Sequence, residues 1–186
     1  DEIQSGLGRT GELWGVDHTS LEPDVITSAK GLRVGATIAS EDLFPEETGR
    51  LSSTWGAGDI VAAAQGVATI DAITSDGLLD NVTERGRQVK EILADEAPEF
   101  VTDVRGNGLM LGVEFDTKDR REAVVTACLE RGLLVLGCGY KTVRLLPPLD
   151  VTEREIDVAM DVFGDALADR KVRHAGPSAG HSEDVV

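Results

Sequence analysis

One of the five lysines of this chain, Lys30, lies where an apolar, β-branched run meets a glycine, in the sequence DVITSAKGL. At the carboxyl end of a strand in an α/β sheet, a side chain points into the crevice where ligands bind. A lysine held there away from water is disfavoured as an ammonium, and its free amine can form a Schiff base with a carbonyl group. The alternative interpretation is a surface lysine in a turn.

An acid and an amide stand upstream of this lysine, in the opening sequence DEIQ. The carboxylate of Asp1 could pair with a protonated ring nitrogen, and the amide of Gln4 could hydrogen-bond a ring oxygen. Pyridoxal phosphate needs such a combination, because an acid keeps its pyridine nitrogen protonated while a lysine binds its aldehyde. The alternative is that Asp1 and Gln4 only solvate a turn.

Hydrophobic periodicity and turn residues predict the elements that must position these side chains. Asp59 precedes an alanine-rich helix, the pair Asp76-Gly77 precedes a second helix that stops before Pro98, and Thr152 with Glu155 forms a capping box before the last helix. The predicted strands are 24–29, 33–39, two runs around Gly106–Gly108, and two short ones within 133–139 and 142–148; the predicted helices are 59–75, Leu78–Glu96, 119–131 and Val151–Asp169. After Lys171 the chain has too little apolar surface to fold.

Composition limits the classes of partner. The 186 residues carry a net charge of −16, which opposes binding to nucleic acid or to an anionic membrane. An acidic chain poor in lysine suits a protein that stays soluble at high salt, so we expect a halophilic source. The two cysteines form neither a disulfide framework nor a metal-ligand pattern, and no apolar run could span a bilayer, which predicts a cytoplasmic protein without a metal site. Because the chain begins with Asp and not Met, we expect a preceding segment to be missing.

The opening stretch DEIQSGLGRTGELWGVDHTSLEPDVITSAKGL resembles the signature region of class III (omega) pyridoxal-phosphate aminotransferases. Their pattern is D-E-V-Q-[ST]-G-x-G-R-T-G, then E-P-D-[IV], then a lysine in [AS]-K-[GK]. The resemblance implies that Asp1 binds the pyridine nitrogen, Ile3 packs on the ring face and Gln4 approaches the ring hydroxyl. It also implies that Lys30 forms the Schiff base and, once displaced by the substrate amine, becomes the base that moves a proton between the substrate carbon and the cofactor.

Further matches extend to about residue 168. By the same resemblance, Ser53 and Thr54 in RLSSTWGAGD reach the cofactor phosphate of the partner subunit in a homodimer, although a capping turn would explain them equally well. Arg144 in VLGCGYKTVRLLPPL is similar to the arginine that clamps a substrate carboxylate, with a surface ion pair as the alternative.

The sequence also departs from the family pattern. Most members follow the lysine with K-G-L-G-G-G, whereas Lys30 is followed by GLRVGATIAS. This form is more similar to the branch of 4-aminobutyrate and L-lysine 6-aminotransferases than to the acetylornithine branch. The family's phosphate-binding loop, its ring-stacking aromatic residue and much of its substrate pocket precede the Asp in sequence and are not in this chain.

The resemblance implies an α/β chain of fold type I, comprising the end of the large domain and the α+β C-terminal small domain. The expected divisions are 1–57 for the large domain, 58–76 for a connecting helix, 77–170 for the small domain and 171–186 for a disordered tail. The implied activity is transfer of a terminal amino group, as in 4-aminobutyrate or lysine, to a 2-oxo acid such as 2-oxoglutarate. Two alternatives are an aminomutase, racemase or decarboxylase on the same scaffold, and a non-catalytic, truncated dimerisation or regulatory module.

Overall fold

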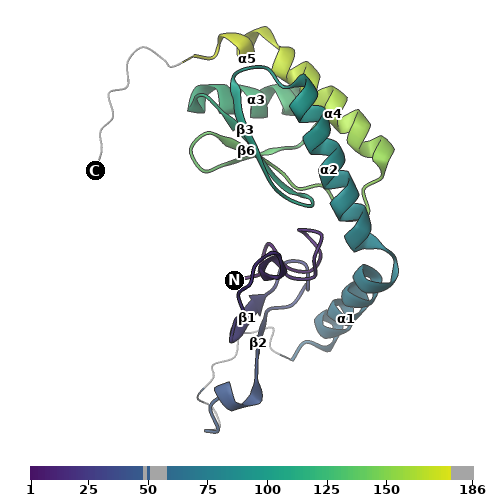
Figure 1. The fold of residues 1–186 in the computed structure, drawn as a ribbon. Coiled ribbons are helices and arrows are strands. Elements are labelled where there is room, and N and C mark those ends of the chain that lie inside the picture. Colours follow the sequence, from purple (N-terminus) through teal and green to yellow (C-terminus); the bar gives the residue numbers. More distant parts are fainter. Residues whose placement is uncertain (48–49, 51–57, 177–186) are drawn as a thin grey trace, which may run out of the picture. The chain divides into compact units, whose positions relative to one another are not determined.

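A two-stranded antiparallel hairpin carries the DVITSAKG run, in the computed structural model that describes residues 1–47, 50 and 58–176 (Figure 1). Strands β1 (Val25–Ser28) and β2 (Ala36–Ala39) pair over their full lengths. Both lie inside the predicted strands, and β2 starts later than expected because a turn follows Lys30. Single 3₁₀ turns, η1 (Gly15–His18) and η2 (Glu41–Leu43), stand on either side of the hairpin in sequence.

The chain forms two compact units, Asp1–Val82 and Thr83–Val186, and their boundary falls within helix α2 (Leu78–Glu96). Helix α1 (Ile60–Ser75), which corresponds to the expected connecting helix, lies in the first unit. Its Gly66 lies directly against Leu32, since a Cβ atom at Gly66 would be 3.1 Å from the carbonyl oxygen of Leu32. This close packing explains why α1 joins the hairpin's unit.

Helix α1 begins where the sequence predicted. The carboxylate of Asp59 accepts hydrogen bonds from the amides of Val61 and Ala62, at 2.9 and 3.1 Å, and so satisfies two free donors of the first turn. The helix is apolar on nearly all sides, and only Gly66 and Ile73 are buried. Among the residues that the structure describes, no helix has the length and apolar character needed to cross a bilayer.

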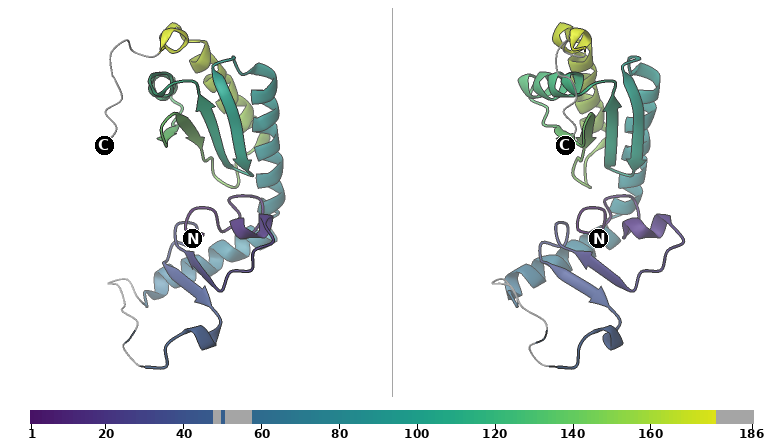
Figure 2. Two further views of the ribbon diagram at one scale, coloured as in Figure 1. Left: turned by 60° about the vertical axis from the view of Figure 1, so that its left-hand side comes forward. Right: turned by 90° about the vertical axis from the view of Figure 1, so that its left-hand side faces the viewer.

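The second unit is built on a four-stranded antiparallel sheet in the order β3-β4-β6-β5 (Figure 2). The burial pattern of β4 alternates, because Leu111, Val113 and Phe115 are fully buried while Gly112 and Glu114 are partly exposed. One face of the sheet therefore packs into the core and the other stays open. Its strands are β3 (Val101–Asn107), β4 (Met110–Phe115), β5 (Leu136–Cys138) and β6 (Thr142–Leu145), and its further helices are α3 (Lys118–Glu130) and α4 (Glu153–Ala168).

The turn between β3 and β4 is held against α2. A Cβ atom at Gly86 would lie 2.2 Å from the carbonyl oxygen of Gly108, so only glycine allows the helix and the turn to approach this closely. One helical turn further along α2, Lys90 donates from Nζ to the carbonyl oxygen of Gly106. The hairpin is thus attached to the helix by a steric contact and a hydrogen bond.

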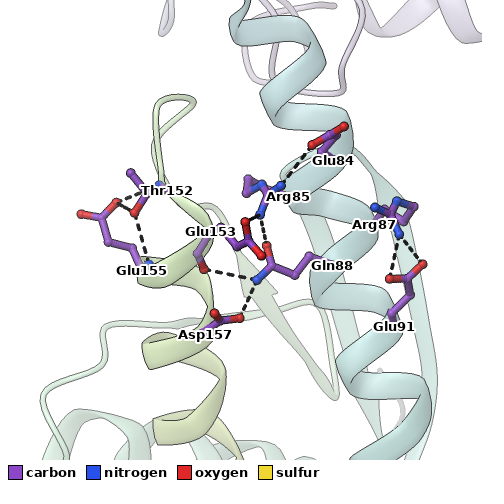
Figure 3. Close-up of polar contacts among 9 residues, drawn as sticks. All are labelled: Glu84, Arg85, Arg87, Gln88, Glu91, Thr152, Glu153, Glu155 and Asp157. Atoms are coloured by element: carbon purple, nitrogen blue, oxygen red, sulfur yellow. Dashed lines mark hydrogen bonds and ion pairs between the residues drawn. The ribbon is translucent and has the colours of Figure 1, made fainter.

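Polar side chains join α2 to the start of α4 (Figure 3). Gln88 donates from Nε2 to Asp157 Oδ1 at 2.6 Å and to the carbonyl oxygen of Glu153 at 3.2 Å, and its own Oε1 accepts from Arg85 at 2.5 Å. The capping box predicted for α4 is confirmed, since Thr152 Oγ1 accepts from the Glu155 amide and the Glu155 carboxylate accepts from the Thr152 amide at 2.8 Å. These contacts fix where α4 begins.

The prediction that the chain stops folding after Lys171 is wrong for its first residues. A short helix, α5 (Arg170–His174), follows α4, and Val172 is fully buried. Arg120 of α3 donates to the carbonyl oxygens of Val172 and Arg173, at 2.8 and 3.1 Å, and pairs with Asp116 at 2.6 Å. The cation that anchors α5 comes from a distant part of the sequence, so local composition could not reveal it.

Candidate functional site

Lys30 lies two residues after β1, at the strand end where the sequence predicted it. Its side chain is exposed, and Nζ donates to Gln4 Oε1 at 3.4 Å. The structure therefore brings the predicted amine and the predicted amide together from opposite ends of the signature stretch.

Asp1 is held beside the same strand. Its Oδ1 accepts from the Ile3 amide at 3.0 Å and from Thr27 Oγ1 at 3.3 Å. The amide of the next residue, Glu2, donates to the carbonyl oxygen of Thr27 at 2.8 Å, so the first residues run alongside β1. A carboxylate, a partly buried isoleucine, an amide and an amine thus gather at one end of the hairpin.

Glu2, which is not among the predicted site residues, is buried in this loop. It accepts hydrogen bonds from Ser5 Oγ at 2.5 Å and from the amides of Gly15 and Val16 at 3.0 and 2.8 Å. Burial alone would raise the pKa of Glu2, but these hydrogen bonds outweigh it and hold the pKa below its ordinary value. The only signal in the sequence was its place between two predicted site residues.

Two residues other than glycine adopt left-handed backbone angles next to the site. Leu7, with φ 53°, is buried and lies directly against Gly31, the residue after Lys30. Arg33, with φ 67°, occupies the position where the pattern K-G-L-G-G-G has a glycine. The turn after Lys30 therefore keeps a backbone shape that favours glycine although the residue is arginine.

Arg144 lies in β6 of the second unit, between Gly112 of β4 and Leu136 of β5 in the strand register. Its side chain makes no hydrogen bond or ion pair within the described part of the chain, and Nε is buried without a partner. The nearby cations on this sheet are paired, because Arg105 and Lys141 both contact Glu114. Arg144 is thus a partly buried guanidinium that is free to bind an anion.

Arg144 also lines a cavity of about 510 Å³ whose other walls are apolar, including Leu136, Leu146 and Phe163. A larger cavity, of about 850 Å³, lies in the same unit between the C-terminal parts of α2 and α4, but none of the predicted site residues lines it. Of these two cavities, the smaller one is therefore the one lined by a predicted site residue.

Ser53 and Thr54 are the remaining predicted site residues, and both lie outside the described residues. Over the ranges that are described, no group of three or more histidine, cysteine or acidic side chains is placed to hold a metal ion.

The donor set around Lys30 fits a pyridoxal phosphate ring. An amine for the aldehyde, a carboxylate for the ring nitrogen and an amide for the ring hydroxyl are the groups that this cofactor needs. Lys30, Asp1 and Gln4 carry side chains of these three kinds within one loop and hairpin.

Comparisons with known proteins point the same way. The sequence model described as aminotransferase class-III matches residues 1–167. Acetylornithine aminotransferase from Caldanaerobacter subterraneus subsp. tengcongensis is 41% identical over 175 residues, which cover 91% of this chain and 44% of the relative. The acetylornithine aminotransferase of Synechocystis is 43% identical over 179 residues, which cover 90% and 41%. The chain therefore spans about two fifths of the length of these curated relatives.

Solved structures show the same relationship. The lysine aminotransferase from M. tuberculosis superimposes with a TM-score of 0.80 at 30% identity, over 90% of this chain and 40% of that protein. An S-selective transaminase from Arthrobacter sp. gives a TM-score of 0.85 at 25% identity, over 95% and 45%. The chain shares the fold of the corresponding parts of these proteins.

Proposed function

This chain belongs to the class III aminotransferase family, with the fold type I architecture that the sequence predicted, and we propose that its protein transfers the terminal amino group of an amino acid to a 2-oxo acid. The proposed cofactor is pyridoxal phosphate. The observation that carries this proposal is the hydrogen bond from Lys30 Nζ to Gln4 Oε1, beside the carboxylate of Asp1.

In the proposed reaction each predicted site residue has a defined role. When bound, pyridoxal phosphate supplies the carbonyl carbon that receives the donor's amine and a ring that withdraws electrons. Asp1 holds the proton on the ring nitrogen, Gln4 orients the ring through its hydroxyl, and Ile3 packs on the ring face. Lys30 would bind the cofactor through Nζ, and Nζ, once released, would carry the proton from the reacting carbon of the donor to the carbonyl carbon of the cofactor.

Arg144 is proposed to bind a carboxylate of the substrate. Its support is the absence of a partner for this guanidinium among the described residues, in a chain where acids outnumber bases by 34 to 18. A planar guanidinium pairs with a carboxylate through two parallel hydrogen bonds. We expect Arg144→Lys to raise KM for a 2-oxo acid with little change in kcat, because lysine keeps the charge but loses the second bond.

The amino donor is proposed to carry its reacting amine at the end of the side chain. The residues after Lys30 favoured 4-aminobutyrate or lysine, whereas the curated relatives quoted above are acetylornithine aminotransferases. All three candidates have a terminal amine, so the reaction class is common to them. Initial rates with each donor and 2-oxoglutarate would separate them, and failure to form an amino acid from the acceptor with any donor would favour an aminomutase or decarboxylase.

A second copy of the chain is the proposed partner. Three apolar side chains of α1, Ile60, Val61 and Val67, are 82%, 69% and 60% exposed. A helix that is apolar on nearly all sides is normally buried, so we expect further polypeptide to cover it. Light scattering at several protein concentrations measures whether the protein is dimeric. We also propose a cytoplasmic location, which the pattern of two unpaired cysteines supports.

The Schiff-base residue can be tested directly. The protein is loaded with pyridoxal phosphate and reduced with borohydride, and its peptides are mapped by mass. We expect the pyridoxyl label on Lys30, its loss in Lys30→Ala, and its retention in Lys118→Ala, a variant at an exposed lysine of the second unit. A label that remains in Lys30→Ala, or that is spread over several lysines, would contradict the assignment.

A further inference from the structure

The buried carboxylate of Glu2 is a feature that the proposed reaction does not use. Each of its oxygens is engaged, since Oε2 accepts from Ser5 Oγ and the Gly15 amide while Oε1 accepts from the Val16 amide. Hydrogen bonds to a charged acceptor are stronger than those between neutral groups. A buried carboxylate is unfavourable unless it is hydrogen-bonded, so the conformation of this loop is coupled to the three bonds that the Glu2 side chain accepts.

The backbone of Glu2 is held as firmly as its side chain. Its amide donates to the carbonyl oxygen of Thr27 in β1 at 2.8 Å, and its carbonyl oxygen accepts from the Gly6 amide at 3.0 Å. The first bond ties the residue to the strand that leads to Lys30, and the second closes a turn that contains Gln4. The residues on both sides of Glu2 therefore have little freedom to move relative to β1.

The loop is also sterically closed around this carboxylate. A Cβ atom at Gly15 would lie 2.8 Å from Ser5 Cβ and 3.0 Å from Glu2 Oε2. Because real Cβ atoms do not approach other atoms this closely, only glycine brings its amide within reach of the carboxylate. The amides of Gly15 and Val16 thus meet Glu2 in a site built for a carboxylate side chain.

We propose that Glu2 is the positioning residue of the cofactor site, because its carboxylate fixes the turn that presents Asp1 and Gln4 next to Lys30. This inference rests on the proposed function, whereas the hydrogen bonds of Glu2 are observed whatever the function is. Among the described residues, the Asp1 side chain is held by Thr27 Oγ1 and the Ile3 amide alone, and the Gln4 side chain makes its one hydrogen bond with Lys30. Without the Glu2 carboxylate the segment would keep its main-chain bond to β1 but lose its bonds to Ser5, Gly15 and Val16.

Glu2→Gln tests the proposal with the smallest change of shape. The amide group of glutamine replaces one acceptor oxygen by a donor, and this donor would face either the Val16 amide or the Ser5 and Gly15 donors. A buried donor left without an acceptor would disturb the turn that presents Asp1 and Gln4, so we expect cofactor affinity to fall roughly tenfold. The matched control is Glu155→Gln, which removes a carboxylate of the α4 capping box in the other unit.

Two measurements distinguish positioning from a general loss of stability. The first is hydrogen exchange in the protein without cofactor, where Glu2→Gln should speed exchange at Gly15 and Val16 and also across residues 2–6. The second is the optical titration of the bound cofactor, whose midpoint should shift because Asp1 no longer holds the ring nitrogen in the same way. Glu155→Gln should lower the melting temperature but leave both the exchange of residues 2–6 and the optical midpoint unchanged.

Faster exchange at Gly15 and Val16 with an unchanged cofactor affinity and optical midpoint would overturn the proposal, since Glu2 would then only brace the loop. If Glu2→Gln does not fold, Ser5→Ala removes a single donor and should lower cofactor affinity in the same direction by a smaller factor; no change would also overturn it. Failure of the proposed function is recognised separately, by the absence of a pyridoxyl label on Lys30 in the unchanged protein. The exchange of residues 2–6 would then still decide whether Glu2 positions this segment.

Discussion

The contact between α2 and the β3–β4 turn predicts that one substitution, glycine to alanine, has opposite effects at two helical positions of the second unit. At Gly86 a Cβ atom would lie 2.2 Å from the carbonyl oxygen of Gly108 and 2.6 Å from its carbonyl carbon. At Gly164, within α4, the same atom meets nothing within 4 Å. Both glycines are inside helices, so the intrinsic preference for alanine is shared and the surroundings make the difference.

The magnitudes follow from these distances. Alanine stabilises a helix interior by about 0.8–1.0 kcal/mol relative to glycine, which is the expected gain for Gly164→Ala. Gly86→Ala has the same gain, but the turn must move by roughly 1 Å, and overpacking of this kind costs about 1–3 kcal/mol. The blocking atoms are main chain and cannot rotate away, so we take the upper end, about 3 kcal/mol, and expect a net loss of about 2 kcal/mol.

Thermal unfolding followed by circular dichroism can measure both variants. For a unit of about 100 residues, 1 kcal/mol corresponds to roughly 4–8 °C in melting temperature, so Gly164→Ala should melt about 4–8 °C higher and Gly86→Ala about 8–16 °C lower. Hydrogen exchange at the β3–β4 turn should rise in Gly86→Ala alone. Stabilisation by Gly86→Ala would refute the reasoning, because it would mean that the turn is free to move away from the helix.

Three further predictions concern other contacts. Arg120→Met should destabilise the protein by about 2–4 kcal/mol in urea unfolding, because it removes the buried hydrogen bonds to two α5 carbonyls and leaves Asp116 without its cation. Arg87→Met, at an exposed ion pair with the same sequence spacing, should have no measurable effect, and equal losses would contradict the role of burial. Arg33→Gly should raise stability by up to about 1 kcal/mol, because glycine adopts the left-handed angle without steric cost. The greater freedom of glycine in the unfolded chain offsets part of this gain. An unchanged or lower melting temperature would contradict the prediction. Burial raises the pKa of Cys128 to about 11, so an aromatic disulfide reagent at neutral pH should label the exposed Cys138 and reach Cys128 only after denaturation, as peptide mass mapping would show.

Local signals in the sequence predicted most of the elements. The bounds of α2, Leu78–Glu96, agree with the prediction because the helix-breaking residues Gly77 and Pro98 flank it. The capping box at Thr152 placed the start of α4 for the same reason. Helix α5 was missed because its anchor, Arg120, lies on another helix, and no rule based on neighbouring residues contains that contact.

The site was predictable to a similar degree. Asp1, Gln4 and Lys30 have side chains whose types suggest chemistry, and the structure places them together. Glu2 has the same kind of side chain as Asp1, but its partners include main-chain amides at Gly15 and Val16. Main-chain donors are present at almost every position and leave no mark in a sequence, so the burial of Glu2 could be found only in three dimensions.

The left-handed angle at Arg33 has a consequence for how relatives of this protein are detected. A text pattern that requires glycine at this place after the lysine rejects the chain, although the backbone there is the one that glycine would adopt. A search template that specifies the dihedral angle accepts both residues. For the turn after Lys30, the backbone conformation is therefore a more general signature than the residue type, because both glycine and arginine can adopt it.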